Sequence, residues 1–294
     1  MKKILLLTLI LLLIFALAGC HKGQYDANVV ATTLPVYEFT TYICQGTDIQ
    51  VERLITESVS CLHDYTLKVS QMRAIETAEL IITSGAGLED FLHDALSSTN
   101  NVIDTSEGIH LIADCDGAEY EPSSHTHHHE HDPHIWLSPE NAKIMASNIV
   151  SALSEKHPEH TDLFNENLSA LVQELDALSL YATEQLSNLP NKKIITFHDG
   201  FSYMAESFGL EIVHAVEEES GSEASAAELI SLTHMITDYN VTALFTETNG
   251  ATGAATIIAN ETGISVYELD MVMSQMGYLE AMYYNIDTLK EALQ

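Results

Sequence analysis

The stretch PEHTDLFNENLSALVQELDALSLYATEQLSNLP, residues 158–190, decides how the chain is organised. Its apolar side chains recur every three or four positions, at Leu168, Leu171, Leu175, Leu178, Ala182, Leu186 and Leu189. Because no glycine interrupts it before Pro190, the spacing predicts one helix of ~27 residues within 158–189, about 40 Å long at 1.5 Å per residue. Such a helix is either a rigid connector between two lobes or a long helix within one domain.

Short apolar runs of strand length lie on both sides of this helix, separated by segments of helical periodicity. They cover 29–33, 49–55, 80–83 and 101–104 before it, and 193–197, 211–215, 242–246 and 264–269 after it. This alternation is typical of βαβ units. We therefore predict an α/β fold of two lobes, each a small parallel sheet with flanking helices, joined by the rigid helix 158–189. The N-terminal lobe would cover 29–157 and the C-terminal lobe 190–294.

The first residues have the features of a secretory signal. Lys2 and Lys3 precede an apolar run over 4–17, which is too short to span a bilayer, and small residues follow it. The ending Leu17-Ala18-Gly19-Cys20 resembles a bacterial lipobox, in which the cysteine carries lipid after cleavage. We expect a signal peptide over 1–19, a lipidated tether over 20–28 and an extracytoplasmic protein anchored to the bacterial membrane. The alternative is a plain secretory leader with an incidental cysteine.

Charge and cysteine content restrict the partners and the cross-links. The chain has 11 Lys and Arg against 43 Asp and Glu, a net charge of -32, which repels nucleic acid. Charged residues make up only 18% and hydrophobic residues 46%, so the acidic residues belong to a folded protein, which we expect to be a monomer. Outside the cytosol, Cys44, Cys61 and Cys115 allow at most one disulfide, and the sequence leaves the pairing open.

A histidine-rich loop over 122–133 precedes the first of two long helical segments. Six of the 15 histidines fall between residues 125 and 134, among prolines and acids and without an apolar face. Imidazoles mixed with carboxylates suit borderline ions such as zinc, copper or nickel. A tract without rigid flanks binds loosely, so we expect only accessory metal binding at His125, His127, His128, His129 and His131.

A tight metal site is expected at the ends of the predicted strands, where open α/β sheets bind their ligands. His63 follows the strand at 49–55, and His134 lies just before a helix that begins at Ser138-Pro139. His198 and Asp270 directly follow the strands ending at 197 and 269. Three imidazoles and one carboxylate complete a tetrahedral zinc shell, so these four are the predicted ligands. Glu247, which follows the strand at 242–246, supports the shell or replaces Asp270 in it.

Several motifs carry a resemblance to a known family: HDY at 63–65, DPHIWLSP at 132–139, FHDGFSY at 197–203 and the terminal helix at 285–293. They resemble those of substrate-binding lipoproteins of zinc and manganese ABC transporters, of the zinc-uptake (ZnuA/AdcA-like) type. The resemblance covers nearly the whole mature chain. It implies two lobes around a rigid helix, the ligand set named above, and delivery of Zn²⁺ to an ABC permease and its ATPase. Leu62 and Met271 stand where the family usually has proline.

The leading hypothesis is therefore a non-enzymatic receptor that binds Zn²⁺ with high affinity for uptake. A manganese receptor of the same type and a surface adhesin or metal buffer are alternatives. A zinc metallohydrolase is a further one, but a catalytic zinc usually keeps one position open for water, whereas a fourth protein oxygen is available here. The chain also has no zincin helix motif and no nucleophile elbow.

Overall fold

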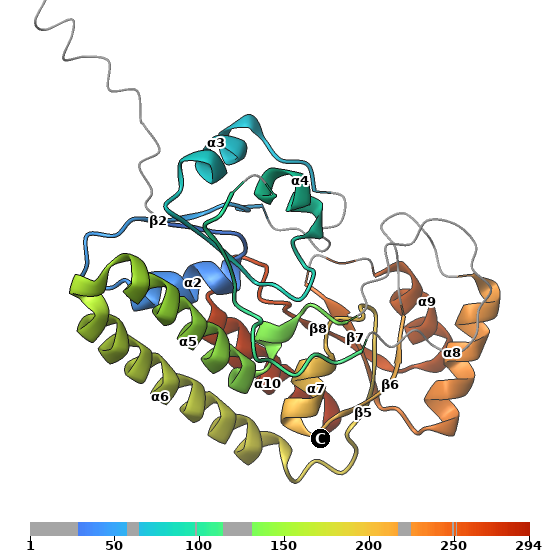
Figure 1. Ribbon diagram of the computed structural model, residues 1–294. Helices are drawn as coiled ribbons and strands as arrows, with labels where there is room; N and C mark the ends of the chain where they lie inside the picture. The colour runs from blue at the N-terminus through green and yellow to red at the C-terminus, as the bar shows by residue number, and fades with distance from the viewer. Residues whose placement is uncertain are drawn as a thin grey trace, which may run out of the picture.

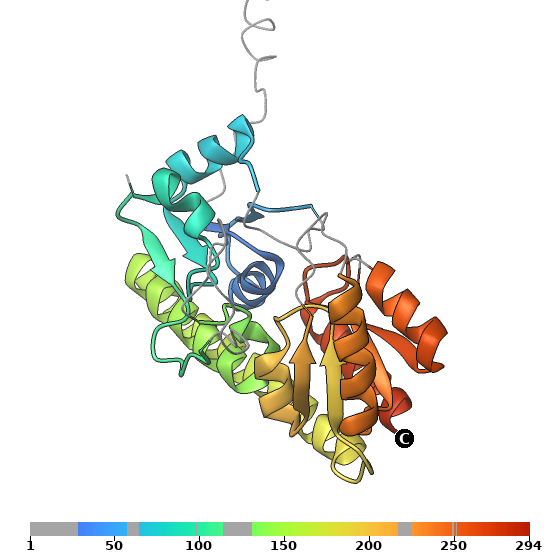
Figure 2. The same cartoon turned by 90° about the vertical axis from the view of Figure 1, so that its right-hand side faces the viewer.

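The computed structural model describes residues 29–57, 65–97, 99–113, 131–216, 225–248, 250 and 252–294. Within these residues the chain forms two lobes, seen side by side in Figure 2. Each lobe contains a four-stranded sheet whose strands are all parallel. No helix in the described ranges is both long and apolar enough to cross a membrane.

The N-terminal sheet has the strand order β2-β1-β3-β4. Its strands are β1 (Val29–Ala31), β2 (Val51–Arg53), β3 (Leu80–Thr83) and β4 (Val102–Asp104). The helices between them are α2 (Leu34–Ile43), α3 (Val69–Thr77), η1 (Asp90–Leu92) and α4 (His93–Leu96). Strands β1 and β3 are fully buried, as expected of central strands covered on both faces.

The C-terminal sheet repeats this arrangement with the order β6-β5-β7-β8. Its strands are β5 (Lys193–Thr196), β6 (Glu211–Ala215), β7 (Ala243–Glu247) and β8 (Ser265–Leu269). The helices of this lobe are α7 (Ser202–Phe208), α8 (Ala226–Asp238) and α9 (Gly253–Thr262). The predicted α/β class with one parallel sheet in each lobe is thus confirmed.

Two antiparallel helices connect the lobes along one side of the molecule (Figure 1). The short turn η2 (Ile135–Leu137) leads into α5 (Pro139–Lys156), and η3 (Pro158–His160) leads into α6 (Thr161–Leu186). The predicted long helix is therefore present as α6, but its first turn is a separate 3₁₀ turn that begins at Pro158. On α6 the buried face carries Leu171, Leu175, Leu178, Ala182 and Leu186, which is the predicted apolar stripe.

The last helix, α10 (Tyr278–Leu293), returns from the C-terminal lobe and packs against α6 and α2. The main hydrophobic core consequently runs through both lobes, from Phe39 in α2 to Leu289 in α10. Polar contacts reinforce this junction: the Trp136 indole donates to the carbonyl of Met271 at 2.8 Å, and the Tyr278 hydroxyl donates to the carbonyl of Trp136 at 2.8 Å. The lobes are therefore held together by a shared core and not by the connecting helices α5 and α6 alone.

Cys44, at the end of α2, is a free and buried thiol. Burial raises the pKa of this thiol to about 12, so it stays protonated and unreactive at neutral pH. Of the cysteines left open by the sequence, Cys61 and Cys115 lie outside the described residues.

Candidate metal centre

Three of the candidate residues lie together at one edge of the C-terminal sheet. Strand β7 lies between β5 and β8, and Glu247 at its end pairs in register with Leu269. His198 follows β5 by two residues, and Asp270 directly follows β8. The parallel register therefore brings the carboxyl ends together as expected, and His198 Nδ1 lies 3.8 Å from Glu247 Oε2.

Glu247 is a buried acid beside a second carboxyl group. Burial, and then the negative charge of Asp270, raise the pKa of Glu247 to about 7. Two carboxyl groups in this position repel one another when both are ionised. A divalent cation bound beside them would offset this repulsion. This fits a role for Glu247 as a residue that contacts either the ion or one of its ligands.

Asp270 is held in one orientation by its neighbours and keeps one oxygen available. Its Oδ1 accepts from the backbone N–H of Val272 at 2.7 Å, while its own backbone N–H and carbonyl both bond to the Asn285 side chain at 2.7 Å. Asp270 is only 1% exposed, and its Oδ2 is a buried atom with no hydrogen-bond partner in the described part of the chain. A buried carboxylate oxygen of this kind calls for an ion or a water as its partner.

His134 reaches the same region from the segment before α5. The Asp132 carboxylate accepts from the His134 backbone N–H at 2.8 Å and lies 2.9 Å from its Nδ1, so it fixes the orientation of the ring. A carboxylate at Nδ1 favours the tautomer that is protonated there and leaves Nε2 available for a metal ion. Asp132 belongs to the motif DPHIWLSP that carries the family resemblance, but the sequence predicts no separate role for it.

A tyrosine of the C-terminal lobe ties the Asp132 segment to that lobe. The buried Tyr203 hydroxyl, on α7, donates to the carbonyl of Asp132 at 2.9 Å and accepts from the backbone N–H of Ile112 at 3.0 Å. Ala113 and His131 pair in an antiparallel bridge next to these contacts. The two chain ends that flank residues 114–130 are thus joined to each other and to α7.

The two histidines from different lobes lie face to edge. The ring centroids of His134 and His198 are 5.2 Å apart, at an interplanar angle of 81°. Two imidazoles bound to one tetrahedral zinc, with Zn–N bonds of ~2.0–2.1 Å, place their centroids roughly 5 Å apart. The backbone of Gly200 lies so close that a Cβ atom there would be 2.7 Å from His134 Nδ1. The spacing of the pair therefore fits a shared ion.

The remaining predicted residues lie outside the described part of the chain: Cys20, His63, His125, His127, His128 and His129. Among the described residues, no three His, Cys, Asp or Glu side chains converge closely enough to hold a metal ion. The structure thus brings together His134 with His198, and His198 with Glu247. The four-residue ligand set stays a prediction.

Sequence reasoning missed the residues that hold these side chains in place. Asn285 gave a usable signal, because it is a polar residue on the apolar face of α10 between Met282 and Ile286. Asp132 also gave one, because an aspartate whose carboxylate accepts from the backbone N–H two residues later forms a local turn. Gly200 gave none, because its contact with His134 joins two distant segments of the chain.

Comparison with known proteins places this geometry in context. The chain is 29% identical to the zinc-binding lipoprotein AdcA of Streptococcus pneumoniae serotype 4 over 307 residues, 99% of this chain but only 61% of that lipoprotein. A crystal structure of ZnuA superposes with a TM-score of 0.77 and 28% identity, covering 92% of this chain and 100% of ZnuA. The laminin-binding protein Lmb of Streptococcus agalactiae, described as having adhesin and metal-transporting activity, gives a TM-score of 0.77 at 26% identity, over 90% of this chain and 99% of Lmb. Residues 29–292 match the family model described as the periplasmic zinc-uptake complex component A, and the chain belongs to this ZnuA family.

Proposed function

We propose that this protein is a non-enzymatic extracytoplasmic receptor that binds one Zn²⁺ between its lobes and delivers it to an ABC permease driven by its ATPase. The observation that carries the proposal is the His134 and His198 pair, two imidazoles from different lobes whose ring centroids lie 5.2 Å apart. His63 and Asp270 complete the proposed four-coordinate shell, with Glu247 next to it. A shell rich in nitrogen with no position left for water suits capture of zinc and not hydrolysis.

The family and relatives support zinc as the cargo. The matching family is described as part of a zinc-uptake complex, and the pneumococcal relative is named a zinc-binding lipoprotein. We propose that Cys20 carries the lipid that holds the monomeric receptor at the membrane after removal of residues 1–19. The loop over 122–133 serves as a loose collector that raises the zinc concentration near the tight site.

Calorimetric titration of the metal-free protein with Zn²⁺ tests the ligand assignment. We expect one tight binding step in the wild type, weakened by orders of magnitude in His63→Ala, His134→Ala and His198→Ala. His160→Ala is the matched control, since this histidine lies in η3 and contacts Asp48 at the surface. Near-unchanged tight binding in all three site variants would refute the assignment.

The adhesin alternative is favoured by one finding, the similarity to Lmb. Binding of the purified protein to immobilised laminin, with and without Zn²⁺, tests it directly. Saturable binding to laminin would add adhesion to the proposed metal receptor, and its absence would leave uptake as the function.

A further inference from the structure

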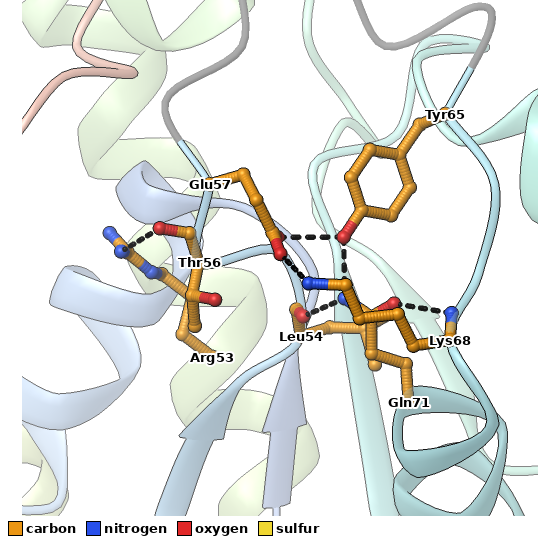
Figure 3. Close-up of polar contacts among 7 residues, drawn as sticks. All are labelled: Arg53, Leu54, Thr56, Glu57, Tyr65, Lys68 and Gln71. Atoms are coloured by element: carbon orange, nitrogen blue, oxygen red, sulfur yellow. Dashed lines mark hydrogen bonds and ion pairs between the residues drawn. The ribbon is translucent and has the colours of Figure 1, made fainter.

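The two chain ends that flank residues 58–64 are joined by polar side chains (Figure 3). One end leaves β2 and reaches Glu57, and the other resumes at Tyr65 and enters α3. The Tyr65 hydroxyl donates to Glu57 Oε2 at 2.7 Å, and Lys68 Nζ forms an ion pair with Glu57 Oε1. These contacts connect the two ends directly, across the segment in which His63 lies.

Gln71 on α3 is the inner member of the group and uses all of its amide hydrogen-bonding atoms. Its Nε2 donates to the carbonyl of Leu54 at 2.6 Å and to the Tyr65 hydroxyl at 2.7 Å, and its Oε1 accepts from the backbone N–H of Lys68 at 2.8 Å. The Gln71 residue is 8% exposed and Leu54 is 2% exposed. One buried side chain therefore bonds to both ends of the segment.

The ion pair of the exposed Lys68 and the hydrogen bonds of the buried Gln71 differ in their expected strength. The Lys68 side chain is 63% exposed, and an ion pair in water contributes little by itself. The bonds of Gln71 are shielded from water, and removing one leaves a buried polar group without a partner. Gln71 and Tyr65 should therefore contribute most to holding the two chain ends together. The Tyr65 ring is also fixed by edge-to-face contact with Phe91, at a centroid distance of 5.9 Å.

We propose that Glu57, Tyr65 and Gln71 form a clasp that fixes the two ends of the His63 segment, and that these three are positioning residues for zinc binding through His63. The inference rests on the proposed function, because it takes His63 as a ligand. Joining the ends of a short segment reduces the conformations open to it, so less entropy is lost when its histidine binds the ion. Without the clasp the same ligand would bind from a broader set of conformations.

Tyr65→Phe is the primary test, because it removes the hydroxyl that bonds to both Glu57 and Gln71 and keeps the ring. We expect the zinc dissociation constant to rise roughly tenfold, as is usual when a residue that orients a metal ligand is lost. Tyr181→Phe is the matched control, since it removes another tyrosine-to-carboxylate bond, from Tyr181 of α6 to Asp287 of α10 at 2.6 Å. Lys68→Arg, which keeps the ion pair, should retain wild-type affinity.

A double-mutant cycle with His63→Ala separates positioning from general stabilisation. If the clasp acts through His63, Tyr65→Phe has no further effect on the weak zinc binding that remains in the His63→Ala background. An equal loss of zinc affinity from Tyr65→Phe in both backgrounds, or no loss of affinity in the wild-type background, would overturn the inference. Unchanged zinc binding in His63→Ala alone would instead remove His63 from the ligand set of the proposed function, and the inference with it. Thermal unfolding of each metal-free variant shows whether the fold is retained.

Discussion

The ring of His134 lies directly against the backbone of Gly200, on the opposite lobe. A Cβ atom at position 200 would be 2.7 Å from His134 Nδ1 and 2.3 Å from the methyl carbon of Met271, closer than real Cβ atoms approach such groups. Glycine at this position therefore allows the two candidate ligands His134 and His198 to come together.

Gly200→Ala should accordingly weaken zinc binding, because the added methyl group must displace the His134 ring. We expect a dissociation constant about 10- to 100-fold higher, comparable to the loss of a residue that orients a metal ligand. Gly253→Ala is the control: this glycine opens α9, and a Cβ there would have no neighbour within 4 Å. Equal affinities in the two variants, measured by chelator competition, would contradict the role assigned to this contact.

The Asp132 carboxylate gives a second prediction. Asp132→Asn keeps an oxygen that can accept from the His134 ring and backbone N–H groups, but removes the charge that makes the imidazole a stronger ligand. Zinc affinity should fall by about tenfold or more, while thermal unfolding of the metal-free protein changes little. Asp176→Asn on the exposed face of α6 serves as the comparison. A variant that binds zinc as tightly as the wild type would show that Asp132 only shapes the backbone.

The positions of the candidate ligands were predictable where one sheet determines them. Glu247 ends β7, and His198 and Asp270 follow the neighbouring strands β5 and β8 within two residues. Parallel strands bring their carboxyl ends to one edge of the sheet. The stripe of leucines likewise predicted α6, because its buried face follows the helical period.

Features that depend on contact between lobes could not be predicted. The terminal helix was expected over 285–293 but begins at Tyr278, where Glu38 of α2 accepts from its backbone N–H at 2.7 Å. An acid from a distant helix stabilises that helix N-terminus, and no local pattern encodes the pairing. The Tyr203 contact with Asp132 was missed for the same reason.

Glu89 predicts how the stability of the metal-free protein depends on pH. It accepts from Thr32 Oγ1 at 2.6 Å, from the Ser84 N–H at 2.7 Å and from the Gly85 N–H at 3.0 Å. Burial nevertheless raises the pKa of Glu89 from 4.5 to about 7. Between these values the folded state binds more protons than the unfolded state, so stability falls as pH rises through this window.

The measurement is the free energy of unfolding of wild type and Glu89→Gln in denaturant at pH 5 and pH 8. The wild type should lose on the order of 2 kcal/mol relative to the variant between these pH values. Glu166→Gln, exposed on α6, controls for the general loss of a negative charge. If the difference in the free energy of unfolding between wild type and Glu89→Gln stays constant with pH, the raised pKa of Glu89 is contradicted.

Deleting residues 125–129 should remove weak zinc binding and leave the tight step unchanged. The deletion spares His131, which pairs with Ala113 next to the segment that carries Asp132 and His134. Replacing the same five residues by a Gly-Ser sequence of equal length controls for the change in chain length. Loss of the tight step in both variants, with the fold intact by circular dichroism, would place the main site in the histidine tract.

The last prediction is a preference for zinc over manganese, and it depends on His198. Manganese favours oxygen-rich shells of higher coordination number, whereas zinc accepts four ligands and binds nitrogen more strongly. His134 and His198 supply two imidazoles to the proposed shell, so both geometry and intrinsic affinity favour zinc. At equal concentrations of the two ions, the wild-type protein should therefore retain zinc, as measured by metal analysis after gel filtration. His198→Glu should reduce the difference between the zinc and manganese affinities. It replaces a nitrogen ligand by a carboxylate, so it should weaken zinc binding more than manganese binding. His160→Glu adds the same charge at the surface end of α6 and should leave the preference unchanged. If the wild type kept manganese against equimolar zinc, a four-coordinate shell with three histidines would have to be abandoned for this protein.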